Sequence, residues 1–440
     1  MDEGRMDDPN SRLKEMGYDQ ELRRSLGMVS VLGLSFAIMA VPFGLSTTLN
    51  IALTNGGPVT IIWGWIFVSI ISILIAASLG EICSVFPTSG GVYYWAAMLS
   101  TPKYSAFASY IIVVILTMAD TRNSAKFAFT HFDNSYAGWP KAWSFFVGVL
   151  QSAYTLTGYG MVAALCEEVK NPAREVPRAM VLSVVAAAIT GVIYLIPLNF
   201  VLPAIEPLLN VASLQPIPLF FKIVTGSPSA AFGLLFLIYG IWLFAFIGSL
   251  TAASRATWAF ARDGGIPASF LWKKVNARTQ VPINALLLSA VVNALLGLIY
   301  LGSYAAFNAF TGVATICLGA SYGFPILCSL LRKRALVKDA PFSLGKFGFL
   351  INIITIVWIT FSIILFCMPT AIPVTPGSMN YASAVFAGFS AIAVLWYAVN
   401  ARKHYKGPLI SSIREKSDGG DLVRSESGYQ SEPKDMVKPL

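Results

Sequence analysis

Long apolar windows alternate with short polar segments along most of the chain. Residues 25–80, 279–331 and 347–401 contain no Asp, Glu, Lys, Arg or His, and each is long enough for two membrane-spanning helices. A membrane-spanning helix needs about 20 mainly apolar residues. The pattern predicts an all-α polytopic membrane protein with about ten spans. We place them at 28–54, 58–80, 104–119, 143–166, 179–202, 230–256, 281–302, 304–331, 348–369 and 380–401.

Composition supports this class. Of the 440 residues, 56% are hydrophobic and 12% are charged, whereas a soluble domain carries roughly 25% charged residues. The two histidines and five cysteines form no metal-ligand motif, and no catalytic grouping lies at a span end. We therefore expect no metal, no cofactor and no enzymatic activity. The net charge of +9 suits basic loops beside a lipid bilayer better than nucleic acid.

The distribution of Lys and Arg gives the orientation. With a cytosolic amino terminus and alternating spans, 27 of the 31 Lys and Arg residues fall on the inner side. Basic residues favour the cytosolic side of membrane proteins, so both termini are predicted to be cytosolic. The polar segments 1–26 and 402–440 are predicted to be disordered tails. They flank a transmembrane domain at 27–401.

Two spans contain residues that interrupt a helix. In the first, Pro42 removes a backbone donor and Gly44 follows it; in the other, Gly158 and Gly160 flank Tyr159. Kinks of this kind are common in membrane helices. However, a pair of interrupted spans, one opening each half of a bundle, indicates a midplane binding site. Broken backbone at that depth is tolerated where protein or a cavity covers it.

Such a site would expose amide groups on one side of each break and carbonyl groups on the other. The amide end suits a carboxylate, and the carbonyl end suits an ammonium group or a coupling cation. Aromatic rings would hold a cationic headgroup by cation–π contact, although packing or lipid contact is the commoner role for each ring. The candidate substrate-binding residues are Ala40, Val41, Pro42, Phe43, Gly44, Thr157, Gly158, Tyr159, Gly160, Trp242 and Phe244.

No acidic residue lies deep inside a span. Glu81, Glu167 and Glu168 lie at the cytosolic ends, so the substrate is either a zwitterion or a cation held by rings and backbone dipoles. Glu167 and Glu168 are candidates for proton coupling. Their alternative role is pairing with Lys170 or Arg174 at the membrane face.

Several motifs resemble those of amino-acid permeases of the APC superfamily. The loop after the second helix of that family resembles EICSVFPTSGGVYYW at 81–95. Its broken sixth helix resembles TGYG at 157–160, and the exit of that helix resembles EEVKNP at 167–172. The signature after its eighth helix is similar to two strings here, ASR at 253–255 and WAFARDGGIP at 258–267. The string ALCEE at 164–168 is closer to choline-permease-like members of the fungal GABA and choline branch.

The resemblance implies a leucine-transporter-type fold, with helices one to five and six to ten forming inverted repeats within twelve spans. Here three candidate spans precede Gly158 instead of five, so the first repeat is predicted to be short, with the gap between about 99 and 130. This departure suggests an incomplete gene model, a splice form or a degraded paralogue.

The predicted function is secondary active import of a small nitrogenous solute by alternating access. Choline and a zwitterionic amino acid, including GABA, remain open as substrates. Proton symport and the plasma membrane are what the resemblance implies, with the vacuolar membrane as the alternative location. The competing interpretations are a non-transporting nutrient sensor and an inactive truncated paralogue or splice form. A channel would need a filter sequence or charged rings, which the sequence lacks.

Overall fold

The protein is described by a computed structural model that covers residues 13–14, 16, 18, 20–89, 95, 132–200, 202–211, 215–300, 304–337, 340–374, 379–402 and 405. These described residues form helices and connecting loops without a β-strand, apart from an isolated bridge between Leu26 and Val169. The predicted all-α class is confirmed. The predicted span at 104–119 and the gap predicted near 99–130 lie outside the described residues.

The first span is divided into α2 (Met28–Met39), α3 (Val41–Thr47) and α4 (Leu49–Thr54), and the second is the single helix α5 (Gly57–Val85). A second interrupted span consists of α8 (Lys141–Gly148), α9 (Leu150–Thr155) and the 3₁₀ helix η2 (Tyr159–Glu168). Both interrupted spans therefore break where Pro42 and Gly158 predict a break.

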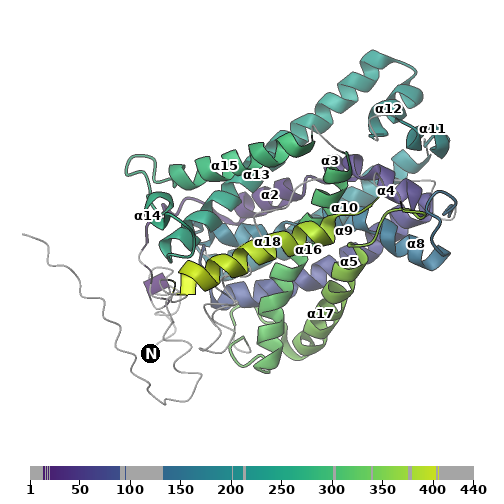
Figure 1. The fold of residues 1–440 in the computed structure, drawn as a ribbon. Helices are drawn as coiled ribbons and strands as arrows, with labels where there is room; N and C mark the ends of the chain where they lie inside the picture. The colour runs from purple at the N-terminus through teal and green to yellow at the C-terminus, as the bar shows by residue number, and fades with distance from the viewer. Residues whose placement is uncertain are drawn as a thin grey trace, which may run out of the picture.

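The remaining elements complete the bundle (Figure 1). They are α10 (Pro172–Phe200), α11 (Ile205–Leu209), α12 (Ile217–Thr225), α13 (Pro228–Arg262), α14 (Ser269–Trp272), α15 (Ile283–Tyr300), α16 (Tyr304–Leu331), η3 (Gly345–Phe347), α17 (Gly348–Leu365), α18 (Ala382–Trp396) and η4 (Tyr397–Ala401). In Figure 1, α13 and α15 run side by side along one edge, while α17 packs beside α5 and α16.

Seven of the described helices are long and apolar enough to cross a membrane. The apolar part of α15 is shorter, at Ile283–Leu298, and α8–α9–η2 is interrupted. Together with these two, the seven helices coincide with nine of the ten predicted spans. The chain is therefore an integral polytopic membrane protein.

Helices α5 and α10 pack closely against each other. The indole of Trp65 is fully buried, and its Nε1 donates a hydrogen bond to the Ala188 carbonyl at 3.0 Å. A Cβ atom on Gly191 would lie 2.2 Å from the same ring. Glycine is needed at this position because the helix backbone approaches the ring directly.

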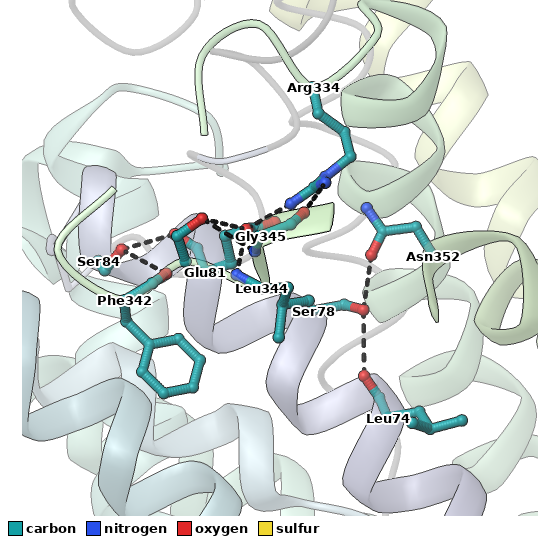
Figure 2. A network of polar contacts seen from close by, with 10 residues as sticks. Leu74, Ser78, Glu81, Ser84, Arg334, Phe342, Leu344, Gly345 and Asn352 are labelled. Atoms are coloured by element: carbon teal, nitrogen blue, oxygen red, sulfur yellow. Dashed lines mark hydrogen bonds and ion pairs between the residues drawn. The ribbon is translucent and has the colours of Figure 1, made fainter. Parts of the chain in front are cut away.

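Arginines from α13 and from the segment after α16 gather at one end of the bundle, which we call the basic end (Arg255, Arg262 and Arg334). Figure 2 shows part of it: Arg334 forms an ion pair with the buried Glu81 of α5. The Glu81 carboxylate also accepts a hydrogen bond from the Leu344 amide at 2.8 Å. Nearby, the Ser78 hydroxyl donates to the Asn352 side chain at 2.7 Å, which joins α5 to α17.

At the opposite end, the segment before α8 packs on the segment after α17. The Ile372 amide donates to the Ala137 carbonyl at 2.8 Å, and Trp139 Nε1 donates to the Pro369 carbonyl at 3.1 Å. The two ends of the bundle are thus held by different segments, because successive spans alternate in direction.

Part of the predicted amino-terminal tail packs against the basic end. Leu13, Met16, Tyr18 and Leu22 are buried. The Tyr18 hydroxyl donates to the Asp263 carboxylate at 3.1 Å. The described residues of segment 1–26 therefore contribute to the bundle.

Candidate functional site

The break in the first span is centred on Ala40. This residue has φ +30° and ψ +57°, a left-handed conformation, and its amide donates to the Phe36 and Ala37 carbonyls, which ends α2. The chain restarts as α3, in which the Phe43 and Gly44 amides donate to the Ala40 carbonyl. Pro42 suits this start because a helix tolerates proline in its first turn.

The break in the second interrupted span lies between Thr155 and Tyr159. Gly158 has φ +89°, which glycine adopts without the penalty that a Cβ atom would bring. The chain then continues as a 3₁₀ helix, whose first described backbone bond runs from the Met161 amide to the Gly158 carbonyl at 2.9 Å. The amides that precede this bond form the positive end of η2.

The two breaks meet inside the bundle. A Cβ atom on Gly158 would lie 2.8 Å from Cγ2 of Ile38, which is two residues before the break at Ala40. Gly248 of α13 approaches the same side chain, with its Cβ position 3.0 Å from Ile38 Cγ1. Glycines on η2 and α13 therefore allow three helices to converge on the end of α2.

A small cavity lies beside the second break. Its volume is about 30 Å³, which is room for one or two water molecules. It is lined from α5, α9, η2, α16 and α17 and from the segment between α9 and η2. The lining residues are Val68, Ser72, Ile75, Ala153, Leu156, Thr157, Tyr159, Thr315, Gly319, Tyr322, Trp358, Ile359, Ser362 and Phe366. The lining is aromatic, aliphatic and hydroxylic, and it contains no acid or base.

Tyr322 of α16 packs against the first residues of η2. Its ring lies 5.3 Å from the ring of Tyr159, centroid to centroid, and a Cβ atom on Gly160 would lie 3.1 Å from its hydroxyl oxygen. The Tyr322 hydroxyl has no hydrogen-bond partner among the described residues. Tyr322 is 1% exposed.

The predicted substrate-binding residues fall into three groups. The first group is at the second break, where Thr157 and Tyr159 line the cavity and Gly158 and Gly160 shape the backbone beside it. The second group surrounds the first break and consists of Ala40, Val41, Pro42, Phe43 and Gly44; the third, Trp242 and Phe244, is on α13.

The two aromatic residues of α13 differ in environment. Trp242 packs against Phe43, with ring centroids 6.2 Å apart, so it adjoins the first break. Phe244 is 68% exposed and does not line the cavity. The structure gives no support for a role of the Phe244 ring in binding.

Sequence reasoning missed Tyr322 and Trp358. Tyr322 lies beside Gly323 and close to Pro325, which is inside α16, and this local pattern is a signal that could have indicated a third irregular span. Trp358 carried no comparable signal, because a tryptophan inside an apolar run is typical of any membrane helix.

The two acidic residues after the second break are paired with arginines of α13. Glu168 Oε1 lies 2.7 Å from Arg255 Nε. Glu167 is held by Arg262 at 3.1 Å and also accepts a hydrogen bond from the Ser89 amide at 3.1 Å. The expected pairing with Lys170 or Arg174 is replaced by these contacts, because the end of α13 lies directly over the end of η2.

Comparison with known proteins gives the family. Two amino acid permease profiles match the chain, one at residues 108–390 and another at residues 34–108. "Amino-acid permease BAT1" of Arabidopsis thaliana is 30% identical, with 92% of this chain and 97% of that protein aligned. The "Polyamine transporter TPO5" of Saccharomyces cerevisiae is 30% identical, with 92% of this chain and 80% of that protein aligned.

The "Choline transporter" of Saccharomyces cerevisiae is 29% identical, with 87% of this chain and 83% of that protein aligned. The relatives are longer within the matched region. The Arabidopsis alignment runs over 500 positions, whereas 92% of this chain is about 405 residues, so about 95 aligned positions have no counterpart here.

The relatives are transporters of nitrogenous solutes, and none of the three is named as an enzyme. The matched profiles together extend over residues 34–390, which is most of the transmembrane region. The chain belongs to the amino acid permease family.

Proposed function

We propose that this protein is a secondary active transporter that carries a small nitrogenous solute across the membrane by alternating access. The observation that carries the proposal is the meeting of the two breaks, where Gly158 packs against Ile38 beside Ala40. Discontinuous helices of this kind supply unpaired backbone dipoles near the midplane. The substrate site therefore lies at the breaks and extends into the adjoining cavity.

In our proposal, the structure represents a state in which the basic end is closed. The ion pairs Glu167–Arg262 and Glu168–Arg255 hold the end of η2 against α13. Access from this side requires η2 and α13 to separate, which breaks both pairs. The basic end is the cytosolic end in our proposal, because basic residues gather there.

The proposed coupling ion is a proton. Protonation of Glu167 or Glu168 would neutralise one partner of an ion pair and release the corresponding arginine. Either carboxylate could thereby link proton binding to opening of the basic end. The plasma membrane is the proposed location, with both termini cytosolic.

Uptake by reconstituted protein tests the proposal. Purified full-length protein in liposomes would be supplied with labelled choline, putrescine or GABA, with and without an inward proton gradient. Accumulation above that of empty liposomes, increased by the gradient, is expected for at least one solute. Gly158→Val should abolish it, because the new side chain would meet Ile38 and the left-handed backbone is unfavourable for valine. Gly233→Ala is the matched control, since nothing lies within 4 Å of its Cβ position.

A chain that binds solute without transporting it is the second candidate. It is favoured by the roughly 95 aligned positions that the Arabidopsis relative has and this chain lacks. Sequencing the full-length transcript across the codons for residues 100–143 separates the candidates. An in-frame insert encoding two more spans would favour the transporter, whereas an uninterrupted match together with absent uptake would favour a sensor or an inactive form.

A further inference from the structure

We infer that Tyr18 is a clasp that holds the basic end closed, and that its release from α13 is a step in the opening of that end. The inference rests on the proposed function, in which η2 and α13 separate. It follows from the way in which the amino-terminal segment crosses the joint between these two elements.

Tyr18 and Gln20 hold opposite partners of one ion pair. The Tyr18 ring centroid lies 4.1 Å from Cζ of Arg262, and the Tyr18 hydroxyl donates to the Asp263 carboxylate at 3.1 Å. Two positions later, Gln20 Nε2 donates to the Glu167 carbonyl at 2.9 Å. Because Arg262 is on α13 and Glu167 is on η2, this short segment bridges the same joint that their ion pair closes.

The contacts of the segment with η2 include backbone hydrogen bonds. The Leu26 amide donates to the Glu168 carbonyl at 3.0 Å, and the Leu26 carbonyl accepts from the Lys170 amide at 3.1 Å. Arg24 donates to the Val169 carbonyl at 3.4 Å. The last carbonyls of a helix have no partner within it, so the segment caps the end of η2. It then continues directly into α2, which itself packs against η2.

The contacts that we assign to the clasp come from the Tyr18 side chain. This side chain is buried, with 6% of the residue exposed, and it binds α13 through one hydroxyl and one cation–π contact. Such contacts break when one side chain moves, whereas Leu26 is held by its backbone on both sides. When η2 and α13 separate, Tyr18 therefore leaves α13 while Leu26 stays with η2.

A reporter thiol in the joint tests the clasp. Ala259 of α13 is fully buried and shares a helix face with Arg255, four residues before it, and Arg262, three residues after it. Ala259→Cys therefore places a thiol where η2 meets α13, and its alkylation by N-ethylmaleimide requires the joint to open. Purified full-length protein would be alkylated, and the modified peptides would be quantified by mass spectrometry.

Tyr18→Phe, in the Ala259→Cys background, removes the hydroxyl and retains the ring. It should speed alkylation at position 259 about tenfold, because a hydrogen bond to a charged group that is made in the closed state is lost. Tyr18→Ala should have a larger effect, since it also removes the ring. Tyr239→Phe, at a position that is 57% exposed on the same helix, is the matched control and should leave the rate unchanged.

Native Cys317, which is buried in α16, distinguishes opening of the joint from general loosening of the bundle. Its alkylation should remain slow in Tyr18→Phe. Equal rates at position 259 in Tyr18→Phe and Tyr239→Phe would overturn the inference, and so would a parallel rise at Cys317.

Amide exchange identifies the part of the segment that lets go, and it needs no reporter thiol. The Met16 and Tyr18 amides donate to the Leu13 carbonyl at 3.2 Å. In hydrogen–deuterium exchange, Tyr18→Phe should speed exchange at positions 16 and 18 severalfold and leave the Leu26 and Lys170 amides slow. An equal rise at all four positions would mean that the whole segment detaches, and would overturn the assignment to Tyr18.

The clasp and the transport function fail separately. If Tyr18→Phe opens the joint while the wild type accumulates none of choline, putrescine and GABA, the clasp stands and the proposed transport function fails. If the wild type accumulates a solute while Tyr18→Phe leaves alkylation at position 259 unchanged, transport stands and the clasp fails.

Discussion

Arg262 and Glu167 form a bidentate ion pair that joins the end of α13 to the end of η2. Each of two guanidinium nitrogens lies 3.1 Å from a different carboxylate oxygen. The same guanidinium lies 4.1 Å from the centroid of the Tyr18 ring and 4.5 Å from that of Trp258. One arginine thus connects the amino-terminal segment, α13 and the broken span.

Replacing Glu167 with Gln should destabilise the protein. The Glu167 side chain is fully buried, and loss of its charge would leave Arg262 without its main partner. Removing one partner of a buried ion pair costs about 3–5 kcal/mol. Thermal unfolding of purified protein in detergent would show a lower midpoint for Glu167→Gln. Glu206→Gln, at an exposed position in α11, serves as control, and equal midpoints for the two variants would contradict the prediction.

Gly348→Ala should break the contact between Arg334 and Glu81. A Cβ atom at Gly348 would lie 2.1 Å from Arg334 Nη2, so the guanidinium would have to leave the carboxylate that it neutralises. The expected loss is about 3 kcal/mol in the free energy of unfolding, typical of a broken buried pair.

A double-mutant cycle checks the cause. In a background of Glu81→Gln with Arg334→Met, Gly348→Ala should cost little, because the ion pair is already absent. Gly388→Ala in α18, where nothing lies within 4 Å of the Cβ position, should be neutral in both backgrounds. An equal loss from Gly348→Ala in both backgrounds would refute this mechanism.

The sequence predicted the spans and the two breaks because these features depend on local chemistry. Apolar length determines a span, and Pro42 or Gly158 interrupts the backbone wherever the neighbouring helices lie. The arrangement of side chains around the breaks depends on tertiary packing instead. Tyr322 lies more than 160 positions after Gly158, and no local pattern indicates that its ring packs against Tyr159 of η2.

The same limit applies to the ion pairs. The sequence places Glu167 near Lys170 and Arg174, so a local pairing is the alternative to proton coupling that the sequence predicts. The observed partners come from α13 because its last turns lie over η2. Phe244 shows the converse: its position in an apolar span beside Trp242 suggested the site, but its side chain is 68% exposed, since neighbouring helix positions face different directions.

Gly191→Ala should weaken the packing of α10 on α5. The new methyl group would lie 2.2 Å from ring atoms of Trp65, and that ring is fixed by its hydrogen bond to Ala188. Overpacking of this kind costs about 1–3 kcal/mol. Thermal unfolding should show the loss for Gly191→Ala but not for Gly233→Ala, an open helical position in α13. Combining Gly191→Ala with Trp65→Leu should recover part of the loss, and an unchanged midpoint for Gly191→Ala would disprove the contact.

Cys83 of α5 and Cys166 of η2 should form a disulfide under mild oxidation. Their sulfur atoms are 3.6 Å apart in the buried interface between the two helices, and a disulfide requires about 2.05 Å, so a shift of about 1.5 Å suffices. With hydrogen peroxide as oxidant, the two thiols lose two protons and two electrons, and the peroxide becomes two water molecules. Mass spectrometry of unreduced peptides should detect this link.

The disulfide should also immobilise η2, because it ties the segment beyond the Gly158 break to α5. Uptake should therefore fall after oxidation and return after treatment with dithiothreitol. Cys166→Ser should retain uptake under the same oxidation, whereas Cys317→Ser, which replaces a buried thiol in α16, should remain sensitive. A link that fails to form would contradict the thiol contact. A link that forms without affecting uptake would show that η2 and α5 move as one unit during transport, in which case opening of the basic end must come from movement of α13 away from both.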